Sequence, residues 1–255
     1  MKLDEVTISR AILSEQSRIM SDYFDIDCAI VGAGPSGLAC AALLAEDGIK
    51  VALIEKKLSI GGGMWGGGMM FPRIVVQEKA VRLLDRFNIR YREYEKGYYV
   101  ASSVESVAKI LSAACDAGAE VFNLTSVEDV VIKEKNCVEG LVINWTAVGM
   151  SHLHIDPLTV RSKITVDATG HDSVVAHMVR NKGGSLEIKG EGFMWAEKAE
   201  SNILNHTKEV FPGLIVCGMA ANAVGGENRM GPVFGGMLLS GEKAAMLAKE
   251  KLGIK

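Results

Sequence analysis

One stretch near the start of the chain constrains its fold more than any other. Residues 27–31 form a short apolar run, residues 32–37 read Gly-Ala-Gly-Pro-Ser-Gly, and residues 38–46 are rich in Ala and Leu. A second apolar run follows at residues 50–55. This order predicts a strand, a glycine turn, a helix and another strand, which together form a βαβ unit. Because the two strands of such a unit pair in parallel, the sequence predicts an α/β protein with a doubly wound sheet.

The glycine turn has the spacing of a dinucleotide-binding site. Gly32 permits the tight turn, Gly34 lets backbone approach a pyrophosphate, and Gly37 lets the helix pack on the strand. Glu55 ends the second strand about 20 residues later, where a carboxylate can accept the ribose hydroxyls of an adenosine. We therefore expect adenine-dinucleotide binding on a Rossmann-like sheet of the FAD/NAD-binding, glutathione-reductase-like type. The alternative is a glycine turn that serves packing alone.

The rest of the chain is consistent with one domain, residues 1–255, without linkers or repeats. Residues 3–24 place apolar side chains among charges at roughly helical spacing and predict one or two amphipathic helices. Alternating residues at about 119–146 predict three strands, interpreted as a β-meander inserted in the nucleotide fold. Further short strands are expected at residues 91–100, 163–167 and 214–217. Further helices are expected at residues 77–87, 103–117, 173–180 and 236–251.

Charge and cysteine content exclude several classes of function. Lys and Arg total 28 against 31 Asp and Glu, a net charge of −3, so the positive potential that drives nucleic-acid binding is missing. No apolar run approaches the roughly 18 residues of a membrane span. The five cysteines are odd in number and follow no metal-binding spacing. We expect a cytoplasmic protein that binds neither nucleic acid nor membrane.

Met219 bears on which dinucleotide is bound. Flavoproteins of this architecture usually have an Asp after the last strand, and its carboxylate holds the ribityl chain of the flavin. Here the run Leu-Ile-Val-Cys-Gly of residues 214–218 is followed by Met219. A thioether is a weak acceptor that cannot replace the carboxylate. This favours NAD or an ADP-containing product, while an FAD-dependent oxidoreductase remains an alternative if another group replaces the missing acid.

Two segments carry candidate metal ligands. His171 follows the strand at residues 163–167, on the side of the sheet where ligands bind. His152, His154 and Asp156 are spaced two apart, so an extended backbone would direct them to one face. Such a set suits Fe(II) or Zn(II) and leaves positions open for substrate. The alternative for both segments is an ordinary solvated loop.

Taken together, these motifs resemble the thiamine thiazole synthase family, in its archaeal branch, over nearly the whole chain. The segments that carry the resemblance are residues 32–37, 54–56, 61–68, 154–157 (His-Ile-Asp-Pro), 167–172 (Asp-Ala-Thr-Gly-His-Asp) and 225–232 (Gly-Gly-Glu-Asn-Arg-Met-Gly-Pro).

The resemblance implies that NAD is a substrate. Nicotinamide leaves, the ribose opens and isomerises to a ketone, glycine condenses with it, and sulfur is added before cyclisation to an adenylated thiazole carboxylate for thiamine biosynthesis. Eukaryotic members take sulfur from their own cysteine in a single turnover, whereas His154 stands at that position here. The resemblance therefore implies an enzyme that uses free sulfide and Fe(II) over many turnovers.

The resemblance also implies roles for individual residues. Ser36 and the glycines of the turn hold the pyrophosphate, and Glu55 holds the adenosine ribose. Asp156 and His171 are the metal ligands, Arg229 clamps the glycine carboxylate, and His154 transfers protons. The remaining residues implied to line the NAD site are Lys56, Gly63, Val127, His154, Ile155, Asp156 and Met219.

In this family Asp156 can reach the site of an adjacent subunit, and a homo-octamer is expected. The alternative is a non-catalytic NAD-binding sensor, in which His154, Asp156, His171 and Arg229 share no task.

Overall fold

The computed structural model describes residues 2–134 and 136–254; Met1, Lys135 and Lys255 lie outside the described residues. Its centre is the predicted βαβ unit, formed by β1 (Asp25–Val31), α2 (Pro35–Ala45) and β2 (Val51–Glu55). The two strands pair in parallel, from Cys28 opposite Val51 to Val31 opposite Ile54. Every residue of α2 is buried, which explains why this helix is apolar on all sides. The predicted βαβ unit with parallel strands is confirmed.

The main sheet extends to both sides of this unit in the order β10-β11-β9-β1-β2-β6. The parallel strands are β1, β2, β6 (Glu120–Asn123), β9 (Leu158–Asp167) and β11 (Leu214–Val216), and β10 (Lys208–Phe211) is antiparallel at one edge. The carboxyl ends of β1, β2, β9 and β11 therefore meet at one edge of the sheet. Ligands bind at this edge in open α/β sheets.

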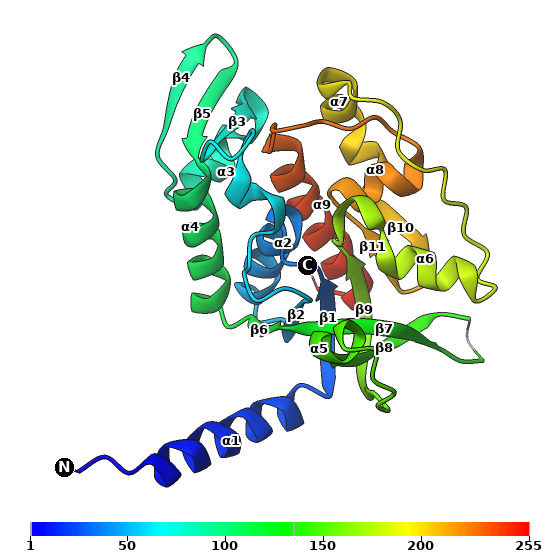
Figure 1. Ribbon diagram of the computed structural model, residues 1–255. Coiled ribbons are helices and arrows are strands. Elements are labelled where there is room, and N and C mark those ends of the chain that lie inside the picture. Colours follow the sequence, from blue (N-terminus) through cyan, green and yellow to red (C-terminus); the bar gives the residue numbers. More distant parts are fainter. Residues whose placement is uncertain (1, 135, 255) are drawn as a thin grey trace.

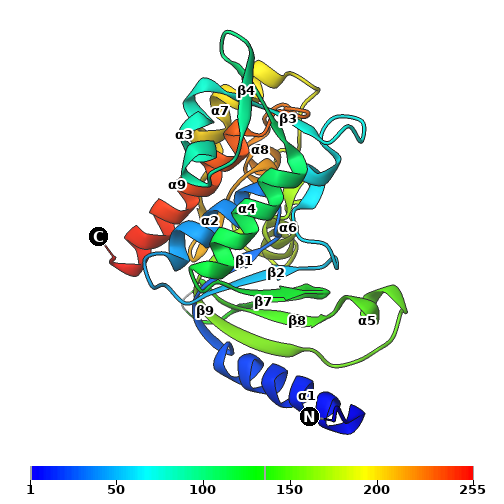
Figure 2. The same ribbon diagram turned by 90° about the vertical axis from the view of Figure 1, so that its left-hand side faces the viewer.

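The two faces of the sheet are covered differently. Helices α2, α4 (Ser103–Asp116) and α9 (Gly235–Leu252) share one hydrophobic core with α3 (Glu78–Arg86). The second core lies between the sheet, the strands β7 (Thr125–Ile132) and β8 (Val138–Trp145), and α6 (Val174–Asn181). Figure 2 shows β7 and β8 on the side of the sheet opposite α2, α4 and α9. The expected α/β class is confirmed, with strands covering much of the second face.

The inserted meander differs from the expectation in one strand. We expected the three strands of residues 119–146 to form it, but β6 pairs in parallel with β2, from Ala52 opposite Glu120 to Glu55 opposite Asn123. The antiparallel set is instead β7, β8 and the first half of β9. Strand β9 is ten residues long, so it pairs with β8 at one end and with β1 and β11 further along. The sequence also predicts a turn at Lys135 and Asn136, between the second and third of these strands, but Lys135 lies outside the described residues.

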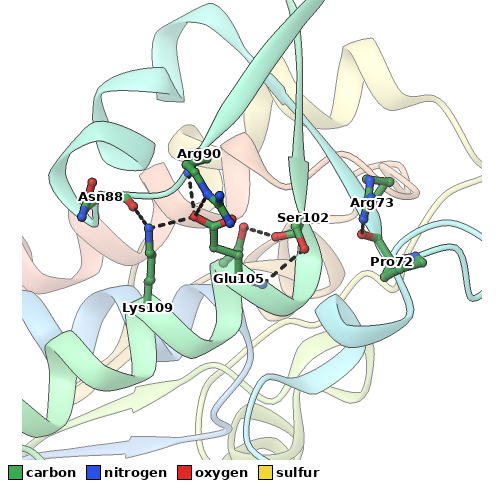
Figure 3. Close-up of polar contacts among 8 residues, drawn as sticks. Pro72, Arg73, Asn88, Arg90, Ser102, Glu105 and Lys109 are labelled. Atoms are coloured by element: carbon green, nitrogen blue, oxygen red, sulfur yellow. Dashed lines mark hydrogen bonds and ion pairs between the residues drawn. The ribbon is translucent and has the colours of Figure 1, made fainter.

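A smaller three-stranded sheet forms an arm beside the helical face (Figure 1). Its order is β3-β5-β4, with β3 at Arg73–Gln77, β4 at Tyr91–Glu95 and β5 at Tyr98–Ser102. Glu105 in the first turn of α4 ties the arm to the body, since its carboxylate accepts hydrogen bonds from the backbone N–H and Nε of Arg90 and from Nζ of Lys109 (Figure 3). Ser102 caps the same helix by accepting from the Glu105 N–H at 3.3 Å.

The sequence analysis did not predict strands β3 and β10. It also did not predict five helical elements: η1 (Gly62–Gly66), α5 (Thr146–Met150), η2 (Gly170–Asp172), α7 (Ala196–His206) and α8 (Met219–Gly225).

The N-terminal segment forms one helix, α1 (Glu5–Asp22), capped by Asp4, which accepts from the Thr7 N–H at 2.8 Å. None of its residues is buried, and Figures 1 and 2 show it projecting from the body. The exposed apolar side chains of this helix include Val6, Ile8 and Ile12. The predicted helix is confirmed, and its first turns leave these apolar side chains exposed, whereas Met20 near its end lies against the body.

Candidate active site

The glycine turn between β1 and α2 forms a tight cradle. Gly32 has a φ of +97°, and a Cβ there would lie 2.5 Å from the carbonyl oxygen of Ala168. A Cβ on Gly37 would lie 2.0 Å from the carbonyl oxygen of Gly32, so Gly37 packs beneath the turn. Gly34 is the N-cap of α2, and a Cβ there would meet no atom within 4 Å. The first N–H groups of α2 thus face a space that an anion can enter closely.

Glu55 is connected to this cradle and to the segment that follows β2. Its Oε2 atom accepts a 2.9 Å hydrogen bond from the Ala33 N–H, and its Oε1 atom accepts one of the same length from the Lys57 N–H. The residue is only 6% exposed. Each carboxylate oxygen has two lone-pair sites, so acceptor capacity remains for ribose hydroxyls. The position and orientation of Glu55 fit the predicted role.

One cavity of about 660 Å³ lies along the carboxyl ends of the parallel strands. The expected binding residues that line it are Gly32, Gly34, Ser36, Glu55, Lys56, Gly63, Val127, His171 and Met219. Side chains that the sequence analysis did not single out also line it, among them Thr125, Thr169, Asp172, Phe234 and Met237. The cavity therefore joins the cradle for a nucleotide to the segment that carries His171.

Met219 begins α8 directly after Gly218, which has a φ of +63°. A Cβ on Gly218 would lie 2.3 Å from Oγ of Ser36, so this turn lies directly against the first turn of α2. Met219 is buried and lines the cavity. The carboxylate that a flavin ribityl chain needs is thus replaced by an apolar side chain pointing at the ligand space.

A buried aspartate shapes the loop that carries His171. Asp167 ends β9 and accepts hydrogen bonds from the N–H and Oγ of Thr169, at 3.0 and 2.7 Å, and from the Ala176 N–H at 2.9 Å. Burial raises the pKa of Asp167, and these hydrogen bonds oppose that rise. The aspartate therefore fixes the loop of residues 168–173 and the start of α6, and with them the backbone of His171.

The His171 side chain is held by a residue that the sequence analysis missed. Its Nδ1 atom lies 2.6 Å from Oε1 of Glu191, and the other carboxylate oxygen, Oε2, lies 3.8 Å from Nε of Arg229. Arg229 does not line the cavity, but Glu191 connects it to His171, which does. Glu191 stands between Gly190 and Gly192, and a lone carboxylate between two glycines is the only signal the sequence offers for it.

The cavity lining does not include His154, Ile155 or Asp156. They belong to an exposed loop between α5 and β9, where the Asn144 side-chain amide donates to the carbonyl of Ile155 at 3.1 Å. Across residues 2–134 and 136–254, no three His, Cys, Asp or Glu side chains are grouped to hold a metal ion. Within one chain, His171 lines the cavity and Asp156 does not.

The parallel sheet, the glycine turn and a cavity along the strand ends define a Rossmann-type protein with a nucleotide-sized site. Residues 9–234 match the Thi4 family, and the chain belongs to this family. It is 70% identical to the thiamine thiazole synthase of Methanoculleus marisnigri, over 99% of this chain and 100% of that protein. The family expected from the motifs is confirmed.

Solved structures agree with this assignment. The crystal structure of Thermovibrio ammonificans THI4 has a TM-score of 0.97 at 49% identity, covering 99% of this chain and 100% of that one. A geranylgeranyl bacteriochlorophyll reductase-like protein from Thermoplasma acidophilum has a TM-score of 0.59 at 17% identity, covering 90% and 79%, and shares the fold alone. In the described part of the chain, no helix has the length and apolarity that crossing a membrane requires.

Proposed function

We propose that this protein is a cytoplasmic thiamine thiazole synthase that makes the adenylated thiazole carboxylate, ADP-thiazole, from NAD, glycine and free sulfide. It acts as a transferase of the pentosyl-transfer type in thiamine biosynthesis. One observation carries the proposal: Glu55 and His171 line the same cavity, so a nucleotide and a reacting centre fit in one continuous space. Its volume of about 660 Å³ lies within the range of cavities that bury small molecules. The names of the family's relatives support the class of reaction.

The adenosine and pyrophosphate of NAD bind at the cradle. The N–H groups at the start of α2 face the pyrophosphate, and Ser36 adds a hydroxyl beside them. Glu55 accepts the ribose hydroxyls and repels a 2′-phosphate, which favours NAD over its phosphorylated form. Lys56, Gly63, Val127 and Met219 line the rest of the dinucleotide, because they border the same cavity.

Arg229 binds the carboxylate of glycine. A planar guanidinium suits a bidentate carboxylate. Its Nε faces Glu191 at 3.8 Å, and the guanidinium side chain is 53% exposed, so its other N–H groups can meet a substrate carboxylate. His154 and Ile155 reach the NAD of an adjacent subunit, where the imidazole of His154 exchanges protons near neutral pH.

The metal site combines His171 of one chain with Asp156 of an adjacent chain in a homo-octamer. Two observations support this pairing: Asp156 lies on an exposed loop, and the Nδ1 atom of His171 is occupied by Glu191. A histidine that ligates a metal usually donates its other N–H to a carboxylate in this way. An imidazole and a carboxylate fit Fe(II) and leave positions for substrate. When bound, Fe(II) would supply sulfide to the reacting carbonyl carbon.

Free sulfide is the sulfur source, because the cysteines are poorly placed to donate it. Cys28, Cys40 and Cys217 are buried, and burial raises the pKa of each thiol, that of Cys28 to about 12. The thiolate is the nucleophilic form, so these groups are inert near neutral pH. No cysteine is among the described residues that line the cavity.

An anaerobic reaction with product analysis by mass spectrometry tests the proposal. Protein incubated with NAD, glycine, Fe(II) and sulfide should form an adenylated thiazole, and leaving out any one of the four should abolish it. The His171→Ala variant should bind ADP as the wild type does and form no thiazole. Wild-type protein that binds NAD unchanged under the complete conditions would contradict the proposal and support an NAD sensor. A yellow protein with a flavin absorbance band would support an oxidoreductase.

A further inference from the structure

Glu191 lies in a loop that is held firmly in place. The loop, residues 189–195, follows α6 and runs beside α8 and the segment after it. Backbone hydrogen bonds join Lys189 N–H to the Val224 carbonyl at 3.3 Å, Gly190 N–H to Ala223 at 3.0 Å and Gly192 N–H to Glu227 at 2.9 Å. These bonds lie on both sides of Glu191 in the sequence. The backbone of Glu191 is therefore fixed relative to the site before its side chain makes any contact.

The same loop also holds the backbone of Arg229. The Arg229 N–H donates to the Phe193 carbonyl at 3.2 Å, and the Trp195 N–H donates to the Arg229 carbonyl at 3.0 Å. Residues 189–195 thus carry Glu191 and simultaneously set the position of the arginine that its carboxylate faces.

The two oxygens of Glu191 face two different groups of the proposed site. Oε1 lies 2.6 Å from Nδ1 of His171, and Oε2 lies 3.8 Å from Nε of Arg229. The Glu191 side chain is 15% exposed, unlike the solvated partners of an ordinary surface ion pair. A carboxylate accepts hydrogen bonds, so this contact favours a hydrogen on Nδ1 and leaves Nε2 as the ring nitrogen that faces away from Glu191.

We propose that Glu191 is the positioning residue shared by the metal ligand and the glycine clamp. One oxygen fixes the tautomer and ring orientation of His171, so that Nε2 is available to a metal. The other oxygen orients the guanidinium of Arg229. This inference rests on the proposed function, and it adds a single carboxylate that couples the metal and glycine positions.

The test uses the full-length assembled protein without oxygen, with Co(II) as a visible-absorbance probe. Glu191→Ala should weaken Co(II) binding about 10- to 100-fold, as losses of such supporting carboxylates do. It should also raise the KM for glycine. Glu191→Gln keeps an acceptor oxygen for His171 and loses the charge opposite Arg229. Its Co(II) affinity should therefore fall less than that of the alanine variant, while the KM for glycine still rises. The affinity for ADP should stay that of the wild type in both.

Glu187→Gln is the matched control, because Glu187 is an exposed glutamate of the segment that leads into the same loop. It should leave Co(II) affinity and the KM for glycine unchanged. If Glu191→Ala keeps the wild-type Co(II) affinity and the wild-type KM for glycine, the role of Glu191 is overturned. If the alanine variant does not fold, the same result in Glu191→Gln overturns it. Wild-type protein that binds no Co(II) would instead contradict the proposed metal site itself.

Discussion

The carboxylate of Glu55 accepts a 2.9 Å hydrogen bond from the backbone N–H of Ala33. The acid that ends β2 is thus joined directly to the glycine turn that follows β1. This contact therefore joins the proposed ribose subsite at Glu55 to the proposed pyrophosphate subsite at the glycine turn.

Glu55→Gln should lower the affinity for NAD by roughly tenfold or more, because a hydrogen bond to a charged group contributes about 1.5–3 kcal/mol. The amide also turns one N–H donor toward the Ala33 or Lys57 N–H, which each need an acceptor. Calorimetric titration with NAD measures the effect. Glu95→Gln, at an exposed position on β4, is the control and should bind NAD normally. Equal NAD affinities of Glu55→Gln and Glu95→Gln would contradict a role of Glu55 in binding the ribose.

Alanine should affect two glycines of the same turn differently, lowering stability at Gly37 and NAD binding at Gly34. A Cβ on Gly37 would lie 2.0 Å from the Gly32 carbonyl oxygen, so Gly37→Ala should lower the free energy of unfolding by about 1–3 kcal/mol. A Cβ on Gly34 would enter open space, so Gly34→Ala should change stability by less than about 1 kcal/mol. Gly34→Ala should nevertheless weaken NAD binding, since the methyl group occupies the cradle. Thermal unfolding with and without NAD separates the effect on stability from the effect on NAD binding. A stable Gly34→Ala protein that binds NAD as the wild type does would contradict a pyrophosphate at this turn.

Local sequence patterns predicted the central part of the fold well. The βαβ unit combines apolar strands, a glycine turn and an apolar helix within 31 residues, from Asp25 to Glu55, so each element restricts the others. The pairing of β6 with β2 escaped prediction, because alternation describes the faces of a strand and not its neighbour. Helices α7 and α8 were missed, since α8 is short and buried and lacks an amphipathic period.

In the candidate site, too, some residue contacts could be predicted from the sequence and others could not. Glu55 and the glycines are near in sequence and follow a known spacing, so their meeting was predictable. Glu191 and Arg229 lie 38 residues apart and face each other only because two irregular loops run side by side. No periodic pattern in the sequence predicts that contact. In the proposed metal site, Asp156 comes from a second chain, and the sequence of one chain does not predict how two chains are placed.

Complementation between subunits tests the shared metal site. His171→Ala and Asp156→Ala chains should each be inactive alone, because each assembled site then lacks one ligand. Co-expressed in equal amounts, they should regain about a quarter of the wild-type activity, since random association pairs an intact His171 with an intact Asp156 in that fraction of sites. Asp156→Ala co-expressed with the double variant should regain none, as no intact Asp156 is present. Failure of the first mixture to recover activity would contradict a site built from two chains.

The Glu105 cluster predicts an acid-dependent loss of stability. Hydrogen bonds from Arg90 and Lys109 lower the pKa of Glu105 to about 2 from its ordinary value of 4.5. The stabilisation is therefore fully present above about pH 4.5 and is lost as the pH falls through 2. Glu105→Gln should lower the Tm at pH 7, and the difference from wild type should shrink between pH 4.5 and 2. Thermal unfolding monitored by circular dichroism checks this, and a difference that stays constant over this range would show that the charge of Glu105 is not responsible.

The number of product molecules made per protein chain tests the central claim most directly. Protein, NAD, glycine and Fe(II) are incubated without oxygen in excess sulfide, and both the adenylated thiazole and the intact protein mass are measured. The family resemblance places His154 where eukaryotic members have the sulfur-donating cysteine, and no thiol is among the described residues that line the cavity. We therefore expect product to exceed the number of chains and the protein mass to stay unchanged. Product that stops at one molecule per chain, with the protein losing the mass of hydrogen sulfide, would contradict this account.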